Sequence, residues 1–302
     1  MDNNSILVRD SQDSSIRSAL VNAIGSWTTP YSVRPSGMFG SIAIVKCGNL
    51  SISSEKLDLE FTVPFDDDME PNEAEIVIYN IEDSTIAKFK MGSLISIEAG
   101  YGDDTGVLFE GYITKVKTRR EDGIDKVTTI KAMDDIKNHT VESISFAAGT
   151  QASYILKTLL DRTGIPIAVF TPRRDHTYVD SQTVDGDLMA NIKKYATVCG
   201  ISAYVNKGKI YARHKKEGDN FEFYVDWTTG LIGTTSDYTE EIKAEDFTET
   251  VNGYEAEMLL QHRISTGAIV RLNSKNVFGD FRVCSGEHRF SEFEAITKIK
   301  VY

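Results

Sequence analysis

Residues 75–135 alternate apolar and polar side chains over short segments that are separated by turn-forming residues. A period of two is typical of β-strands that bury one face. The pattern predicts four strands, at residues 75–80, 94–99, 107–118 and 126–133. The apolar register shifts between Ile113 and Val116, which indicates a β-bulge that curls the sheet. Short strands with a bulge and hairpins predict a small, closed or nearly closed β-barrel.

A weaker copy of this pattern returns at residues 267–302. Segments 267–272, 281–285 and 293–301 follow one another in the order and spacing of segments 92–97, 107–111 and 126–133. Few residues are identical, but the alternation agrees. We interpret the two stretches as a duplication of one barrel within the chain.

The middle of the chain has a different period. Apolar residues recur at helical spacing in two segments, 150–162 and 187–199, each followed by glycine. The stripe of the first segment consists of Ile155, Leu156, Leu159 and Leu160, and that of the second of Leu188, Ile192, Tyr195 and Ala196. A strand at 165–170 and a hairpin at 202–212 complete a predicted α+β unit of about 80 residues, within the range of small domains.

The predicted fold is therefore mainly β with an α+β insert: two tube-like β-barrel domains flank a smaller α+β domain. The expected boundaries are an N-terminal arm at 1–35, a first barrel at 36–140, the α+β domain at 141–218 and a second barrel at 219–302. A helix-like patch at 14–24 lies in the arm.

Charge and composition exclude several function classes. The chain of 302 residues carries a formal net charge of −12, so binding driven by phosphate contacts, and with it sequence-specific nucleic-acid binding, is not expected. Its basic run, Lys115 to Arg120, is interpreted as a solvated strand end. Three cysteines without CxxC spacing and the lack of a secretory signal predict synthesis in a reducing compartment. No apolar run is long enough to predict membrane insertion.

No pattern of catalytic or ligand-binding residues stands out. The five histidines form no metal-binding or HExxH spacing, and GxSxG, Walker and GxGxxG sequences are absent. The acidic run Asp66, Asp67 and Asp68 lacks the spacing and glycine of a calcium loop, which favours a solvated loop. Cys199 closes an apolar helix face and is expected to be packed. We therefore predict no catalytic, cofactor or metal site, and a chain that is not an enzyme.

The first predicted barrel resembles a known family. The string EIVIYNIEDSTIAKFKMGSLISIEAGY (75–101), then VLFEGYITKVK (107–117) and a hairpin ending TTIKAMDD, is similar to hub proteins of contractile phage-tail baseplates. These include the late-control protein D type and the hub of defective Bacillus-type prophages. The first part of type VI secretion spike proteins is similar too. The matching residues are Ile78-Tyr79-Asn80, Gly92, Ala99-Gly100-Tyr101, Phe109, Gly111 and Asp134-Asp135.

The resemblance implies a structural role. Members form homotrimers whose two barrels per subunit build a pseudo-sixfold ring, which joins the sixfold tail tube to the threefold spike. The implied partners are the tail tube protein, the spike protein, the tape-measure protein and the surrounding baseplate proteins. The chain would be made in the bacterial cytoplasm and assembled into the baseplate of a phage or a tailocin-type bacteriocin. No spike or cell-wall-degrading domain is expected within it.

Within this hypothesis the expected functional residues lie at interfaces. We expect the loop 66–72 and the turn 101–106 at the barrel ends, near contacts with other subunits or the tube. The candidate interface residues are Asp66, Asp67, Asp68, Tyr101, Asp103 and Asp104. Charge reversal at Asp103 and Asp104 is expected to impair assembly while the monomer stays folded.

Two other functions remain open from the sequence. One is a carbohydrate-binding β-module of a cell-targeting particle, with Tyr101, Tyr112 and Trp227 as the aromatic candidates. The other is a peptidoglycan hydrolase built on the α+β insert, residues 145–215.

Overall fold

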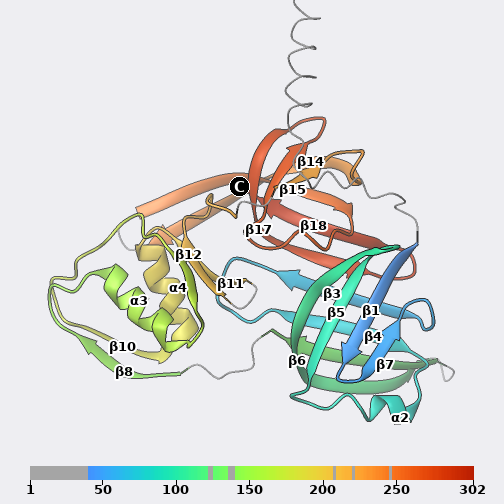
Figure 1. Cartoon of the computed structure of the whole chain (residues 1–302). Coiled ribbons are helices and arrows are strands. Elements are labelled where there is room, and N and C mark those ends of the chain that lie inside the picture. The colour runs from blue at the N-terminus through green and yellow to red at the C-terminus, as the bar shows by residue number, and fades with distance from the viewer. Residues whose placement is uncertain (1–39, 122–124, 135–139, 207–208, 220–221, 245–246) are drawn as a thin grey trace, which may run out of the picture. The chain divides into compact units, whose positions relative to one another are not determined.

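From residue 40 onward the chain folds mainly into β-strands, which confirms the mainly β class with few helices (Figure 1). The computed structural model describes residues 40–121, 125–134, 140–206, 209–219, 222–244 and 247–302. The predicted arm and its helix-like patch at 14–24 lie outside these residues. Among the residues described, none of the helices combines the length and the apolar character needed to cross a membrane.

The first predicted barrel region forms seven strands, which we call the first repeat. They are β1 (Ser41–Cys47), β2 (Leu50–Ser53), β3 (Leu59–Phe65), β4 (Glu73–Tyr79), β5 (Leu94–Tyr101), β6 (Asp104–Glu121) and β7 (Asp125–Met133), with the short helix α2 (Asp83–Ile86) before β5. Their order in the sheet is β3-β4-β7-β6-β5-β1-β2, with antiparallel neighbours. The predicted bulge is confirmed, between Ile113 and Lys115 of β6. Ile76, Ile95 and Ile130 pack in its core.

The C-terminal region forms the second repeat. Its strands are β13 (Glu222–Val225), β14 (Leu231–Ala244), β15 (Phe247–Leu259), β16 (Ile269–Asn273), β17 (Phe278–Phe290) and β18 (Ala295–Val301). The order of pairing is β14-β15-β18-β17-β16-β13. Every pair is antiparallel except β13 with β16, which is parallel. Val270, Val283 and Ile299 pack in its core.

The two repeats share one pairing scheme. The order β3-β4-β7-β6-β5 in the first corresponds to β14-β15-β18-β17-β16 in the second, and all of these neighbours are antiparallel. The next strand differs, because β1 is antiparallel to β5 whereas β13 is parallel to β16. The bulge of β17 falls between Val283 and Ser285, at the position of the bulge in β6. Gly92 and Gly267, which precede the matched strands β5 and β16, both have the positive φ that favours glycine. The echo in the sequence thus corresponds to equivalent strand pairing.

One pair of strands joins the repeats. β3 runs antiparallel to β17, with Phe61 opposite Phe290, and completes a sheet of 13 strands. The rings of these two phenylalanines stack with centroids 5.5 Å apart. The sequence predicted two barrels but not this continuity, because alternation within a strand does not specify which edges meet. The predicted domain boundaries stay predictions.

The α+β insert has a separate core of buried residues. It comprises β8 (Thr140–Phe146), α3 (Ala152–Arg162), β9 (Ile167–Phe170), β10 (Gln182–Asp187), α4 (Leu188–Val198), β11 (Ser202–Asn206) and β12 (Lys209–Arg213). β8 pairs with β10, and β11-β12-β9 form a second small sheet. The predicted stripe of α3 is fully buried. The polar segment that became β10 carries no alternation, so this strand was missed.

Candidate functional site

The loop that connects β3 to β4 lies where the two repeats and the α+β insert meet. Its second residue, Asp67, accepts a hydrogen bond from Arg282 of β17, with Nη1 and Oδ2 2.8 Å apart. The Arg282 side chain is 0% exposed and that of Asp67 is 12% exposed. Arg282 also donates to the Lys215 carbonyl and stacks over the ring of Tyr204. This ion pair is shielded from water, so the loss of either partner would leave a buried charge.

Further polar contacts fix the same loop, which we call the junction loop (residues 66–72). Lys193 of α4 donates to Asp68 and Glu70, over 3.2 and 3.3 Å. Thr266, which precedes β16, donates to the carbonyl of Asp66 over 2.9 Å. The acidic run is therefore bonded to α4 and to the second repeat, rather than being the freely solvated loop that the sequence favoured.

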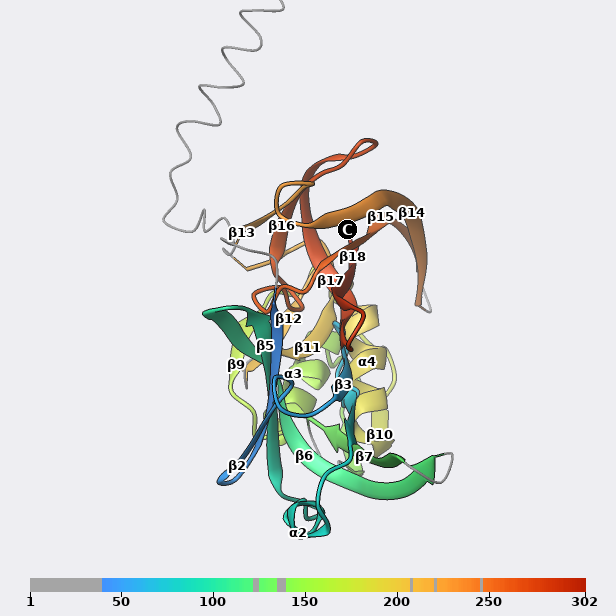
Figure 2. The same ribbon diagram turned by 90° about the vertical axis from the view of Figure 1, so that its right-hand side faces the viewer.

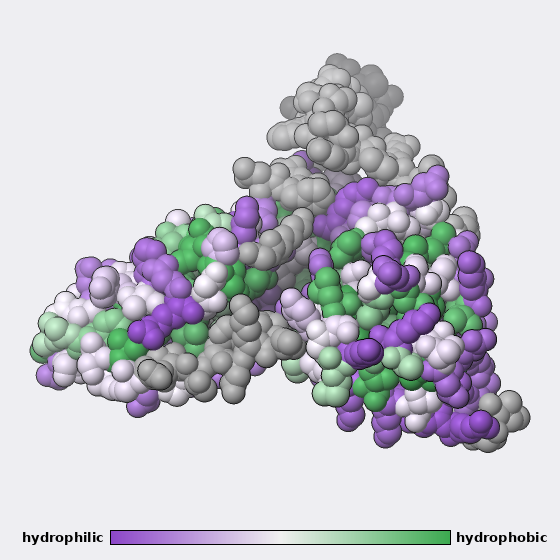
Figure 3. Space-filling model, turned by 60° about the horizontal axis from the view of Figure 1, so that its bottom comes forward, coloured by the Kyte–Doolittle hydropathy of each residue, from purple (hydrophilic) through white to green (hydrophobic). Residues whose placement is uncertain are grey.

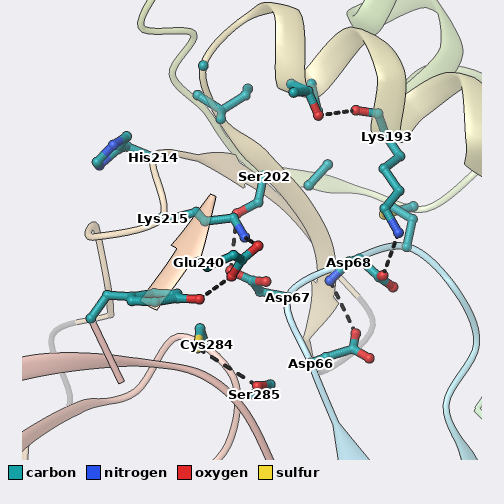
Figure 4. Close-up of a pocket in the computed structure, with 17 residues that line it drawn as sticks. Asp66, Asp67, Asp68, Lys193, Ser202, His214, Lys215, Glu240, Cys284 and Ser285 are labelled. Carbon is teal, nitrogen blue, oxygen red and sulfur yellow. Dashed lines mark hydrogen bonds and ion pairs between the residues drawn. The ribbon is translucent and has the colours of Figure 1, made fainter. Parts of the chain in front are cut away.

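A cavity of about 340 Å³ opens beside the junction loop (Figure 4). It is lined by the loop, by the C-terminal half of α4 and by residues of β11, β14 and β17. Lys215, Glu240 and Tyr302 form a polar cluster in its wall: Lys215 Nζ donates to Glu240 over 2.8 Å, and the Tyr302 hydroxyl donates to the same carboxylate. This volume is at the lower end of the range for small-molecule sites.

The electrostatics of the cavity do not favour nucleophilic chemistry. Burial raises the pKa of the Cys284 thiol to about 11, so the sulfur stays protonated near neutral pH. Burial and the neighbouring Asp68 raise the pKa of Asp66 to about 6. Within the described part of the chain, no group of three or more His, Cys, Asp or Glu side chains is arranged to hold a metal ion.

The turn between β5 and β6 forms a second contact between the repeats. Asp104 accepts hydrogen bonds from both terminal nitrogens of Arg263, at 2.8 and 2.6 Å, and its carboxylate lies 3.0 Å from His262 Nε2. The hydrogen bonds from Arg263 and His262, against burial, lower the pKa of Asp104 to about 2. The Tyr101 hydroxyl donates to the carbonyl of Ala295. A Cβ at Gly106 would lie 2.1 Å from His262 Nδ1, so only glycine allows this approach.

The sequence-predicted interface residues therefore separate into two kinds. Asp66, Asp67, Asp68, Tyr101 and Asp104 have partners within the chain. Asp103, next to Asp104, is exposed at the same turn. A role of these residues in contacts between subunits stays a prediction.

The residues that complete these contacts were not found from the sequence. Arg282 lies in an apolar strand, between Phe281 and Val283, and that placement was the one available sign of a buried charge. Lys193, His262 and Arg263 carry no local pattern that distinguishes them from surface residues. Their partners lie 123 or more positions away in the chain, and only the folded chain brings them together.

The aromatic residues considered for carbohydrate binding have different environments. Trp227 is 80% exposed and Tyr112 is partly exposed, but the Tyr101 hydroxyl is occupied by its bond to Ala295. The face drawn in Figure 3 shows hydrophilic residues that surround separate hydrophobic patches. Each of Trp227 and Tyr112 lies on a different repeat.

A row of basic residues lies on β6. Lys115, Lys117 and Arg119 alternate along the strand, and with Thr129 and Lys131 of β7 they line a shallow hollow. Lys131 is paired with Glu73 and Glu75 of β4. This basic row stands out in a chain with a formal net charge of −12.

Comparison with solved structures places the fold among phage tail proteins. A tail protein from Neisseria meningitidis MC58 superposes with a TM-score of 0.59 at 9% identity, over 87% of this chain and 96% of its own. The 43 kDa tail protein of prophage MuSo2 from Shewanella oneidensis gives a TM-score of 0.58 at 10% identity, over 87% and 97%. At such identity the likeness concerns the fold, which agrees with the resemblance seen in the sequence.

A third structure comes from a secretion system. The Escherichia coli c3393 protein, described as a component of the type VI secretion system similar to the T4 tail proteins gp27 and gp5, gives a TM-score of 0.56 at 9% identity, over 85% of this chain and 76% of its own. No curated protein matches the chain in sequence. A family model described as the Alg8 N-terminal domain matches residues 67–270, from the junction loop to β16.

Proposed function

The chain belongs to the family described as the Alg8 N-terminal domain, and we propose that it is a structural hub of a contractile tail baseplate. In this proposal three copies form a ring that adapts the sixfold tail tube to the threefold central spike. Its other partners are the tape-measure protein and the surrounding baseplate proteins. The family description assigns no activity to this chain, so the proposal rests on the fold.

The observation that carries the proposal is the duplicated pairing scheme. Strands β3-β4-β7-β6-β5 and β14-β15-β18-β17-β16 present the same antiparallel arrangement twice in one chain. Three such chains offer six similar units to a neighbour with sixfold symmetry, while the ring itself keeps threefold symmetry toward the spike. Closed cyclic oligomers are the usual form of soluble homo-oligomers. The structural likeness to tail proteins supports the same assignment.

Mass measurement tests the proposal. The purified chain is analysed by light scattering alone and together with the proposed spike partner. We expect a trimer alone or in the complex, and trimers at the tube–spike boundary in electron micrographs of particles. A chain that stays monomeric in both settings would contradict the hub assignment.

We propose further that the hub acts without catalysis. The buried thiols support this, because burial raises the pKa of Cys199 to about 12 and that of Cys284 to about 11. A peptidoglycan zymogram of the purified chain should show no cleared band. A cleared band that disappears when residues of the α+β insert are changed would instead support a hydrolase.

A further inference from the structure

Three long stretches of strand edge in the 13-stranded sheet are open among the described strands. One is residues 247–253 of β15, which pair with β14 alone, and the other two lie on β14 and β6. β14 pairs with β15 on one side and has no described partner on the other. β6 pairs with β5 as far as Tyr112, and its residues 114–120 then pair with β7 alone. Exposed edges present unpaired N–H and C=O groups and readily accept another strand.

The contact inside the chain shows how such an edge is used. β17 pairs with β16 over Phe278–Arg282 and, beyond its bulge, with β3 over Gly286–Phe290. β6 corresponds to β17, and β14 corresponds to β3, in the shared pairing scheme. The open part of β6 is therefore equivalent to the part of β17 that pairs with β3. The open edge of β14 is likewise equivalent to the edge of β3 that pairs with β17.

Charge on the two edges is complementary. Lys115, Lys117, Arg119 and Arg120 are all exposed on β6, and residues 114–120 include no acidic residue. Residues 231–241 of β14 include Asp237, Glu240 and Glu241 and no basic residue. Opposite charges across an interface favour the matching partner and penalise the contact of an edge with its own copy.

We propose that β14 of one copy of this chain pairs with residues 114–120 of β6 in a second copy. Eight strands lead from β14 to β6, and every neighbouring pair along that path is antiparallel. The new contact is then antiparallel as well. It is head-to-tail, uses different surfaces on the two copies and can close into a ring. Only its closure at three copies rests on the proposed function.

The contact inside the chain also sets the register. Lys131 pairs with Lys115 and Glu75 in the first repeat, and Lys300 pairs with Ser285 and Glu255 in the second. Lys115 is therefore equivalent to Ser285, and Glu75 to Glu255. Thr62 pairs with Glu75, and Ser236 pairs with Glu255, so Thr62 is equivalent to Ser236.

By this correspondence Arg289 is equivalent to Arg119, and Thr62 is equivalent to Ser236. Because Arg289 pairs with Thr62 inside the chain, the proposed contact places Arg119 opposite Ser236 of the neighbour. Continuing along the antiparallel strands, Thr118 faces Asp237 and Lys115 faces Glu240. Lys115 thereby gains a carboxylate partner, in addition to the Lys215 that Glu240 already contacts within its own chain.

A crosslinking experiment tests the register. T118C and D237C are made as single variants and mixed, and a short thiol-to-thiol crosslinker is added under native conditions. The three native cysteines are buried. We expect covalent dimers from the mixture and none from either variant alone. The control mixture of T118C with E241C moves the second thiol by about 13 Å along the strand and should crosslink at least tenfold less.

A second experiment tests the charges. K115E/K117E should lose assembly in light scattering, while K88E/K90E, which makes the same change of charge at exposed lysines near α2, should assemble as the wild type does. Hydrogen exchange of the assembled wild type should show protection of residues 114–120 and of β14 together, and both should be lost in K115E/K117E.

The outcomes separate the two proposals. An assembly with unprotected edges, no crosslink in the mixture and no effect of K115E/K117E overturns the strand pairing and leaves the hub standing. Crosslinked head-to-tail assemblies of another size support the pairing and contradict the trimeric hub. A wild-type chain that is monomeric alone and with the spike overturns both.

Discussion

Among single residues, Asp67 and Arg282 form the most deeply buried ion pair of the described chain, with a fully buried guanidinium. We expect Asp67→Asn to lower the free energy of unfolding by about 3–5 kcal/mol, because it leaves the Arg282 charge buried without a counter-charge. Asp83→Asn is the matched control: Asp83 pairs with Lys126, but its side chain is 93% exposed, so its loss should cost below about 1 kcal/mol. Urea titration measures both, and equal effects would contradict the burial argument.

His288 provides a test of pH dependence. It is buried beside Phe65 and bonds to the Thr297 hydroxyl, and burial lowers its pKa to about 3. An unfolded histidine has a pKa of about 6.5. Because the folded pKa is the lower one, the unfolded state takes up the proton first. The stability that the neutral ring confers is present above pH ~6.5 and is lost as the pH falls toward 3.

The variant H288Q removes this titration. We expect it to be less stable than the wild type at pH 7.5, and to lose less stability as the pH is lowered from about 6.5 toward 3. Urea midpoints across this range measure the difference. Parallel curves for the two proteins would show that His288 does not titrate between the folded and unfolded states.

At the scale of elements, the β5–β6 turn separates two neighbouring acidic residues. Asp104 binds Arg263 and His262, whereas Asp103 is exposed. We therefore expect Asp104→Lys to lower the thermal midpoint by several degrees, because it places a cation against Arg263. Asp103→Lys should leave the midpoint within about a degree of the wild type. Equal midpoints would show that the contact adds no stability.

Assembly is the second measurement on these variants. The expectation from the sequence was that charge reversal at Asp103 and Asp104 impairs assembly while the monomer stays folded. Asp103→Lys tests that expectation directly, because Asp103 is exposed. Asp104→Lys would also break the contacts with Arg263 and His262 inside the subunit. A normal oligomer from Asp103→Lys would remove Asp103 from the interface.

The elements differ in how far the sequence predicts them. Strands β4, β5, β6 and β7 of the first repeat and the helices α3 and α4 follow from period and turn residues, and so does the bulge of β6. These signals are local, since they depend on residues a few positions apart. β8 and β10 carry no such period and were not predicted. The partners of the acidic junction loop were not predictable either, because Asp67 and Arg282 lie 215 positions apart.

At the scale of the whole molecule, the proposed edge contact is electrostatic in part and should weaken with salt. We expect the concentration at which the copies dissociate to rise at least several-fold between about 0.05 and 0.5 M NaCl, because screening shortens the range of attraction between exposed charges. Light scattering on dilution series measures this. In K88E/K90E the salt dependence should stay, and an oligomer insensitive to salt would contradict a charged interface.

The sequence by itself determined the mainly β class, the α+β insert and the echo between two halves of the chain. These properties follow from the spacing of apolar residues, which can be recognised within each segment without reference to the rest of the fold. The tertiary structure decided that β3 and β17 join the repeats in one sheet, that the acidic loop meets a buried arginine, and that β6 and β14 remain as open edges. Strand edges offer the same backbone groups whatever the sequence, so the choice of partner depends on the packing of the whole chain.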